Sequence, residues 1–273
     1  MSDILEDFSP QALTAAIKAN LFEYYRYLGR SPGAELQEDP RLKWLLTGIP
    51  HPFLNHILCT RMTPDKVDEG IQETLASLRS RNVTNLSWWT EPGTQPINLG
   101  EHLIAHGLTY TDGGPGMALD LLMLNEVTAP LNLTIKQVED VETLREFVHT
   151  AIRGFGLPEP TESACLDLFI GLGFDLPLRN YIGYLHGQPV ATAELFLGAG
   201  VAGIYWVSTV PEGRRQGIGA AMTQAPLREA RELGVRVGIL HASEMGEEVY
   251  RHLGFVEHCQ MNHYVWVSEM SSK

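Results

Sequence analysis

The sequence predicts an α/β fold of the α+β kind, in which two similar units follow one another along the chain. Segments with strand composition alternate with segments of helical periodicity over the whole sequence. A polar stretch containing Ala129-Pro130 separates two halves that repeat the same order of elements. We therefore expect one unit over residues 1–124, a linker over 125–132 and a second unit over 133–273.

Composition and charge limit the kinds of partner. The chain has 273 residues, of which 44% are apolar, which is enough for a well-buried core. The formal net charge is −13, and Asp and Glu outnumber Lys and Arg in both halves. No basic arm is present to neutralise phosphates, which argues against nucleic acid as the main partner. An acidic protein can attract a cationic substrate, although such charge is more often related to solubility alone.

Cysteine usage and the absence of apolar runs indicate the compartment. Cys59, Cys165 and Cys259 are widely spaced, and no C-x-x-C pair occurs. We predict buried thiols in a reducing compartment. The N-terminus is acidic without a signal-like apolar run, and no stretch approaches the roughly 18 to 20 apolar residues of a membrane span. The expectation is a soluble, cytoplasmic protein without a membrane partner.

Periodicity and composition predict the elements of the first half. Helices are expected over 9–29, 65–81 and 99–106, and strands over 56–62, 86–89 and 117–122. Ser9 is the expected N-cap of the first helix, with Pro10 at its first position. Residues 30–53 are rich in Pro and Gly and are predicted to form a loop with one turn around 41–46. A second turn is expected at the Gly-Gly-Pro-Gly sequence of residues 113–116.

The second half has a longer series of elements. Strands are predicted over 133–138, 180–185, 190–197, 203–210, 235–241 and 255–267, and helices over 141–155, 161–172, 217–233 and 247–253. A hairpin at residues 186–188 joins two of these strands.

One stretch of the second half predicts an anion site. Strand formers over 204–210 are followed by Pro211, which offers no N–H to a sheet. Residues 214–219 then open a long helix and contain Gly217 and Gly219. The free N–H groups and the dipole of a helix N-terminus favour negative charge, and glycines let a phosphate approach the backbone. These residues predict a ligand that carries a diphosphate.

The two halves contain an internal repeat. Residues 55–122 and 202–267 both follow the order strand, Pro, long helix, strand, short helix, Gly and strand. Pro64 corresponds to Pro211, and residues 103–108 correspond to residues 250–255. The first copy is shorter at the place where the second has its Arg-Arg-Gln-Gly-Ile-Gly turn, so we expect it to lack the anion site. The alternative is that the halves are two unrelated α/β pieces.

Two motifs of the second half resemble those of a known family. The sequence Arg214-x-x-Gly217-x-Gly219 after a strand and Pro211, and the downstream stretch from Ser243 to Phe255 ending in Tyr-x-x-Leu-Gly-Phe, are similar to the acetyl-CoA signature of the GNAT superfamily of N-acetyltransferases. The resemblance covers residues 133–267 clearly. It implies two tandem GNAT-like domains, each with a mixed, mostly antiparallel sheet flanked by helices. The first would be a degenerate copy without the coenzyme turn, and the second would be catalytic. An unrelated α/β nucleotide binder is the alternative.

The resemblance implies acetyl-CoA as the acyl donor and no metal. Backbone N–H groups of 214–219 would hold the diphosphate, and the pantetheine arm would pair along 207–209 like an added strand. A backbone N–H near Val207 or Ser208 would polarise the thioester carbonyl. Ser243 stands where the family often has Asn. The implied coenzyme-binding residues are Val207, Ser208, Thr209, Arg214, Arg215, Gln216, Gly217, Ile218, Gly219, Ala220 and Ser243.

Two residues are candidates for proton transfer. Tyr250 stands where many family members have a tyrosine that protonates the departing thiolate, and its alternative role is packing against the coenzyme. Glu194, on the strand before the central one, is the first candidate for the base, and its alternative role is structural. His241 or a chain of water molecules follows as a second candidate for the base.

Other polar and aromatic residues receive structural interpretations. His102 and His106 have the i, i+4 spacing of some metal ligands, but no third ligand is evident, so we expect surface histidines. Trp88 and Trp89 are adjacent in a predicted strand, which favours one ring on each face of the sheet.

The sequence thus predicts an enzyme, an acyltransferase that moves an acetyl group from acetyl-CoA directly to a primary amine of a small molecule in a ternary complex. Two alternatives stay open: a non-catalytic acyl-CoA sensor or scaffold, and a protein acetyltransferase acting on a lysine or an N-terminus. The sequence leaves open the acceptor, the base, the oligomeric state (a homodimer included) and the contribution of the first half to the acceptor site.

Overall fold

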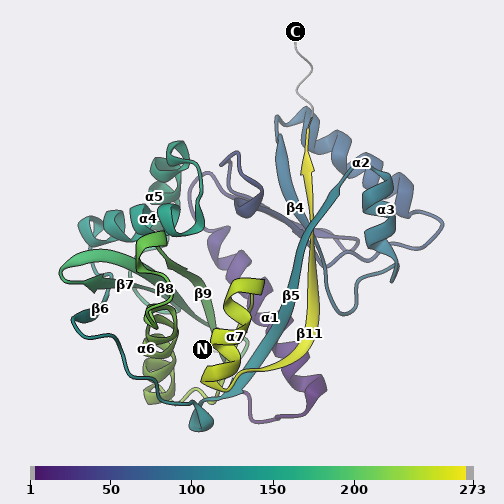
Figure 1. The fold of residues 1–273 in the computed structure, drawn as a ribbon. Helices are drawn as coiled ribbons and strands as arrows, with labels where there is room; N and C mark the ends of the chain where they lie inside the picture. Colours follow the sequence, from purple (N-terminus) through teal and green to yellow (C-terminus); the bar gives the residue numbers. More distant parts are fainter. Residues whose placement is uncertain (1–3, 269–273) are drawn as a thin grey trace.

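A computed structural model describes residues 4–268, and within them eleven strands form one continuous sheet (Figure 1). The order across the sheet is β1-β2-β3-β4-β11-β5-β10-β9-β8-β7-β6. The elements are α1 (Pro10–Leu28), β1 (Glu35–Glu38), β2 (Lys43–Leu46), η1 (Pro52–Leu54), β3 (Asn55–Leu58), α2 (Val67–Ser80), β4 (Asn85–Thr90), α3 (Leu99–Ala105), β5 (Thr109–Asp120), η2 (Leu121–Met123), β6 (Leu133–Gln137), α4 (Val141–Phe155), η3 (Glu159–Thr161), α5 (Glu162–Ile170), β7 (Leu178–Leu185), β8 (Gln188–Gly198), β9 (Val201–Thr209), η4 (Pro211–Gly213), α6 (Ile218–Glu232), β10 (Val237–His241), α7 (Glu244–Leu253) and β11 (Val256–Val267).

The predicted sheet type is confirmed, since the strand pairs are antiparallel apart from β3 with β4 and β9 with β10. The two halves also exchange their last strands. The first-half strand β5 lies between β10 and β11 of the second half. The second-half strand β11 lies between β4 and β5 of the first half (Figure 1). The two expected sheets are therefore one. Residues 125–132 contain no helix or strand, and the division of the chain there stays a prediction.

Residues 113–116 do not form the predicted turn. They continue β5, a twelve-residue strand that pairs with β11 through Gly113, Gly114, Pro115 and Gly116. A Cβ built on Gly114 would lie 1.9 Å from the carbonyl oxygen of Ala242, so this strand lacks a side chain where another backbone crosses it. Close approach, rather than a turn, explains the glycines at this position.

The loop predicted over residues 30–53 is also wrong in part, because it contains the antiparallel pair β1 and β2. Trp44, Leu45 and Leu46 of β2 are all buried, and β2 pairs with β3 on its other side. A short apolar run that is buried on both faces has no alternation to mark it as a strand.

Helices cover both faces of the sheet. One hydrophobic cluster joins α1, α4 and α5 to residues of both halves, a second lies under α6 and α7, and a third lies under α2 and α3. The helix α1 begins with the predicted cap, since the Ser9 hydroxyl accepts a hydrogen bond from the Ala12 N–H. It also ties the halves together, because the Asn20 amide donates to Gly198 O of β8. Trp88 and Trp89 lie on opposite faces of β4, as predicted.

The cysteines are reduced, and the helices are not of the membrane-spanning kind among the described residues. All three cysteines are free thiols, and Cys165 and Cys259 are buried as predicted, whereas Cys59 is half-buried. Among residues 4–268, none of the helices combines the length and hydropathy needed to cross a bilayer.

The exchanged strand predicts that the halves unfold together. Trp266 of β11 is 2% exposed and packs in the first-half cluster under α2 and α3. We expect Trp266→Ala to lower the free energy of unfolding by about 3 to 5 kcal/mol, as is typical for buried aromatic residues. Both halves should still unfold in a single cooperative transition, at a lower temperature. Calorimetry measures the transition, and hydrogen exchange shows which half opens. Val267→Ala, 64% exposed on the same strand, is the control. Melting of the first half alone, with the second half unchanged, would contradict the account.

Candidate functional site

The candidate site begins where two parallel strands separate. β9 and β10 pair only through residues 202–204 with 238–240. Beyond this point β9 continues to Thr209, while β10 ends at His241. In the described chain, no strand pairs with this edge of β9 past Ile204. The predicted residues 207–209 lie on this edge, which is available to an extended ligand that carries amide groups.

A bulge in β9 aims its side chains into the opening. The register with β8 shifts between Thr192 and Glu194, and Trp206 has a φ of 48°. The Thr192 hydroxyl donates to Trp206 O at 2.8 Å and lies 2.8 Å from the buried Ser208 hydroxyl. Because bulges re-aim the backbone as well as side chains, the peptide groups at Val207 and Ser208 are turned relative to a regular strand.

The predicted anion turn follows β9. Arg215 and Gly217 both have positive φ angles, of 60° and 78°, and α6 begins at Ile218 without a side-chain cap. Such an alternation of backbone conformations directs N–H groups to one side, where they form an anion-binding concavity. A Cβ on Gly219 would have no neighbour nearer than 3.9 Å, so the space above the first turn is open. The side chain of Ile218 is buried in the core, so only its backbone can face a ligand.

The polar side chains of the turn have different surroundings. Arg214 donates to Thr209 O at 3.1 Å and to Gly154 O at 2.9 Å, so it fastens the turn to the end of α4. Gln216 donates to Glu212 O. Arg215 is exposed and has no hydrogen bond or ion pair within residues 4–268. Of the two predicted arginines, Arg215 is the one whose side chain is free to meet a phosphate.

The helix α7 forms the opposite side of the opening. The Ser243 hydroxyl caps it by accepting from the Gly246 N–H at 3.3 Å. Tyr250 is buried, and its burial raises the pKa of the phenol to about 12. Its hydroxyl makes no hydrogen bond with another side chain or backbone group in the part of the chain that the structure describes. The phenol is therefore protonated at neutral pH and free to donate.

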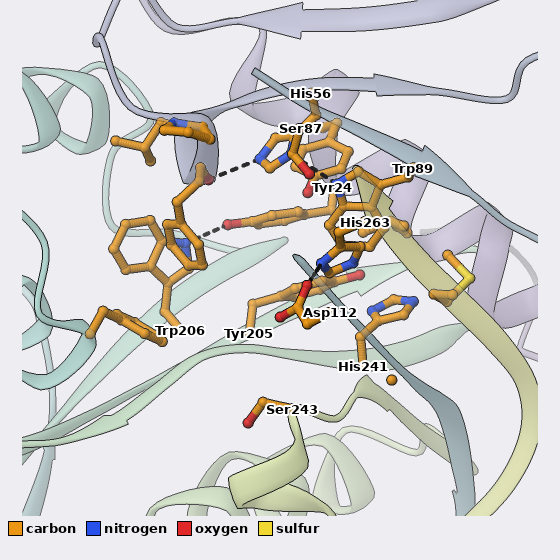
Figure 2. Close-up of a pocket in the computed structure, with 18 of the residues that line it drawn as sticks. Tyr24, His56, Ser87, Trp89, Asp112, Tyr205, Trp206, His241, Ser243 and His263 are labelled. Atoms are coloured by element: carbon orange, nitrogen blue, oxygen red, sulfur yellow. Dashed lines mark hydrogen bonds and ion pairs between the residues drawn. The ribbon is translucent and has the colours of Figure 1, made fainter. Parts of the chain in front are cut away.

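These elements surround one cavity of about 460 Å³, which both halves line (Figure 2). The second half contributes residues of α4, β9, β10, β11 and α7, including Val207, Ser243 and Tyr250. The first half contributes residues of α1, η1, β3, β4 and β5. The opening between β9 and β10 and a wall built by the first half thus share one space.

Comparison with known proteins agrees with this geometry. The sequence model of the family described as "Acetyltransferase (GNAT) domain" matches residues 199–257, from the start of β9 to the start of β11. A GCN5-related N-acetyltransferase from Kribbella flavida has a TM-score of 0.68 at 20% identity, covering 91% of this chain and 95% of its own. Residues 199–257 thus match a GNAT domain, and the whole chain has the fold of the GNAT proteins that it resembles. No significant match was found among curated proteins.

Two further solved structures show that the GNAT fold extends over both halves. A tandem GNAT protein from the clavulanic acid biosynthesis pathway has a TM-score of 0.57 at 16% identity, with 98% of this chain and 97% of that chain covered. A conserved protein of unknown function from Staphylococcus epidermidis has a TM-score of 0.66 at 17% identity, with 87% and 95% covered. At these identities, the similarity establishes the fold.

The first GNAT-like copy has its own strand opening, and the chain itself fills it. β3 and β4 pair only through His56 and Ile57. Beyond them, the Gln95 N–H donates to Thr60 O, and the Met62 N–H donates to Gln95 O. The helix α2 that follows has Asp68 and Glu69 in its first turn, which disfavour an anion. That the first copy is a degenerate domain without the coenzyme turn stays a prediction.

Glu194, the predicted base, does not line the cavity. It is completely buried on β8, where it pairs in register with Tyr205, and neither carboxylate oxygen has a hydrogen-bond partner within residues 4–268. Burial raises its pKa to about 8, and the neighbouring Tyr24 hydroxyl lowers it only in part. Glu194 therefore lies one layer behind Tyr24 and Tyr205, which do face the cavity.

The cavity also contains histidines that sequence reasoning missed or ranked low. His241 lines it with a buried Nε2 that has no partner in the described chain, and burial lowers its pKa to about 3. His56 and His263 come from β3 and β11 and are paired with Trp89 and Asp112. No local motif marks these residues, because strand exchange brings them together.

The pair His102 and His106 is part of a different arrangement. Both rings contact Asp68 Oδ1 at 2.9 Å, and both are mostly shielded from solvent by the neighbouring helices. Among residues 4–268, no group of three or more His, Cys, Asp or Glu side chains is placed to hold a metal ion.

The burial of Glu194 predicts a dependence of stability on pH. Its folded pKa of about 8 exceeds the ordinary value of 4.5, so the folded chain keeps a proton that the unfolded chain releases. The stabilisation is complete below pH 4.5 and is lost as the pH rises through 8. Between pH 5 and 9, we expect the free energy of unfolding to fall by roughly 3 to 5 kcal/mol more in the wild type than in Glu194→Gln.

Chemical denaturation at a series of pH values measures this difference. Glu139→Gln, at an exposed position, is the control and should follow the wild-type curve. Parallel curves for the wild type and Glu194→Gln would show that the buried carboxyl group titrates normally.

Proposed function

We propose that this protein is an acetyl-CoA-dependent N-acetyltransferase that acetylates a primary amine of a small molecule by direct transfer. The observation that supports this best is the shared cavity, where the open edge of β9 and Tyr250 meet a wall built mainly by the first half. The uncapped helix α6 follows β9 along the chain. These are the parts that thioester aminolysis requires: a donor site, a polarising N–H, an acid and an acceptor site.

The second half would bind acetyl-CoA. The N–H groups of residues 215–220 suit its diphosphate, and the Arg215 guanidinium adds a mobile positive charge. The amide groups of the pantetheine arm suit the free edge of β9 at residues 207–209. The thioester would then lie beside the bulge, where the N–H of Val207 or Ser208 would stabilise the oxyanion.

The reaction would then proceed in one ternary complex. The amine lone pair attacks the thioester carbonyl, a C–N bond forms, and the C–S bond breaks as the tetrahedral intermediate collapses. The departing thiolate takes the proton of Tyr250, and the amine nitrogen loses a proton. Burial raises the pKa of Tyr250, and the thiol that forms beside it is desolvated in the same way, which keeps the two groups matched.

The amine must lose a proton during the reaction, and the group that accepts this proton must be reachable from the cavity. Because Glu194 lies behind Tyr24 and Tyr205, a proton from the amine would reach it only through the Tyr24 hydroxyl or a water molecule. His241 faces the cavity directly, but burial makes it a weak base. A relay to Glu194 is the arrangement that we propose, and it operates in the ionised fraction of this carboxyl group, which grows as the pH rises toward its pKa of about 8.

Thiol release from acetyl-CoA in the presence of an amine panel tests the proposal. We expect turnover that depends on the amine, and a fall in kcat of roughly 10² or more in Tyr250→Phe with little change in the KM for acetyl-CoA. Tyr184→Phe is the matched control. Tyr184 lies on the distant strand β7, and the substitution removes a hydroxyl that donates to Glu146 of α4. It should keep the wild-type kcat.

Other outcomes would select the alternatives. Binding of acetyl-CoA without turnover of any amine would indicate a sensor or scaffold. Turnover of peptides alone would indicate a protein acetyltransferase. Equal kcat values for Tyr250→Phe and the wild type would remove Tyr250 from the mechanism.

A further inference from the structure

One wall of the cavity consists of packed aromatic and imidazole rings that acetyl-CoA chemistry does not require, and three of its four residues come from the first half. Trp89 of β4 is at its centre, with His56 of β3 and His263 of β11 beside it (Figure 2). Tyr25 of α1 packs against both Trp89 and His56. The His263 ring lies 3.8 Å from Trp89 between ring centroids, and His56 lies 4.7 Å from Tyr25. We call these four residues the ring wall.

The ring nitrogens of Trp89 and His56, at the centre of the ring wall, already form hydrogen bonds with other groups of the protein. Trp89 Nε1 donates to His56 Nδ1 at 3.1 Å, and His56 Nε2 donates to Phe53 O at 2.9 Å. Burial lowers the pKa of His56 to about 3, so this ring is neutral. Trp89 and His56 can therefore offer a ligand only their faces and edges. Flat apolar groups and cations are the ligands that such faces bind.

The cavity has one carboxylate, that of Asp112, which is paired with His263. The other residues that line it include no Lys, Arg, Glu or second Asp, and the Asp112 side chain is 63% exposed. Asp112 Oδ1 accepts from His263 Nδ1 at 2.8 Å and from the Thr111 hydroxyl at 3.3 Å. Its Oδ2 has no partner within residues 4–268. The free oxygen can hold an ammonium group, and it repels a carboxylate or a phosphate.

We propose that the ring wall and Asp112 form the acceptor subsite, and that the acceptor is an amine on a flat apolar or aromatic body without any acidic group. This inference rests on the proposed acetyl transfer. The body of the acceptor packs against Trp89, and Asp112 draws in the cationic form and rejects amino acids. In the first half, the gap between β3 and β4 is filled by the chain itself. The first half instead supplies most of the residues that select the acceptor for the second half.

Pairs of amines that differ by one carboxylate give a sharp test. We expect kcat/KM to be at least about 10-fold higher for 2-phenylethylamine than for phenylalanine, and for tryptamine than for tryptophan, because the carboxylate meets Asp112. Glucosamine, which is polar all round, should be a poor substrate. Equal rates within each pair would overturn the proposal while leaving acetyl transfer intact.

Variants assign the effect to residues. Asp112→Asn should raise the relative kcat/KM for phenylalanine about 10-fold, and Asp167→Asn, exposed on α5, should not. Trp89→Leu should raise the KM for 2-phenylethylamine about 10-fold, and Trp89→Phe, which keeps a flat ring, should restore most of it. The Kd for acetyl-CoA should stay unchanged in all four. An unchanged preference in Asp112→Asn, or an unchanged KM in Trp89→Leu, contradicts the assignment.

Calorimetry separates this inference from the proposed function. With coenzyme A present, 2-phenylethylamine should bind the wild type and bind at least about 10-fold more weakly to Trp89→Leu. If no amine is acetylated but this difference is seen, the proposed function fails and the subsite stands. If 2-phenylethylamine does not bind, or binds both proteins equally, the subsite is wrong.

Discussion

The antiparallel pairing of β5 with β11 is the interaction on which the rest of the structure depends. Each of these twelve-residue strands ends one copy of the repeat and is inserted into the sheet of the other. The exchange makes one sheet of two and buries a second-half tryptophan, Trp266, in the first-half core. It also places Asp112 opposite His263, and it sets the first-half strand β4 facing the opening between β9 and β10. The site is a property of the joined halves.

The two copies keep the same scaffold and use it differently. Parallel strands separate in both, β3 from β4 and β9 from β10. In the first copy the chain around Gln95 occupies the gap with its own backbone hydrogen bonds, and acidic residues begin the following helix. In the second copy the gap opens into a cavity, and Gly217 begins a helix without a cap. In the first copy, the absence of the glycine turn thus goes together with a filled gap between β3 and β4.

Local chemistry determined which features the sequence could predict. The Ser9 cap, the glycine turn at Gly217 and the two-sided placement of Trp88 and Trp89 depend on neighbours within a few residues, and these predictions are confirmed. The glycines of β5 were misread because the carbonyl that excludes a side chain at Gly114 belongs to Ala242, far along the chain. The same distance in sequence hid the Asp112–His263 and His56–Trp89 pairs. Glu194 was found by its strand position, but the bulge of β9 and the burial of β8 set it behind the cavity wall.

The central claim is that one copy holds the coenzyme and the other completes the acceptor site. Isothermal titration of the full chain with acetyl-CoA tests it most directly. The account predicts one binding site per chain, and weaker binding in Gly217→Ala, because a positive φ of 78° strains any other residue. Gly187→Ala has the same kind of strain, at a φ of 79° in the β7–β8 hairpin, and should bind like the wild type. Two equivalent sites per chain, or equal weakening by both substitutions, would contradict it.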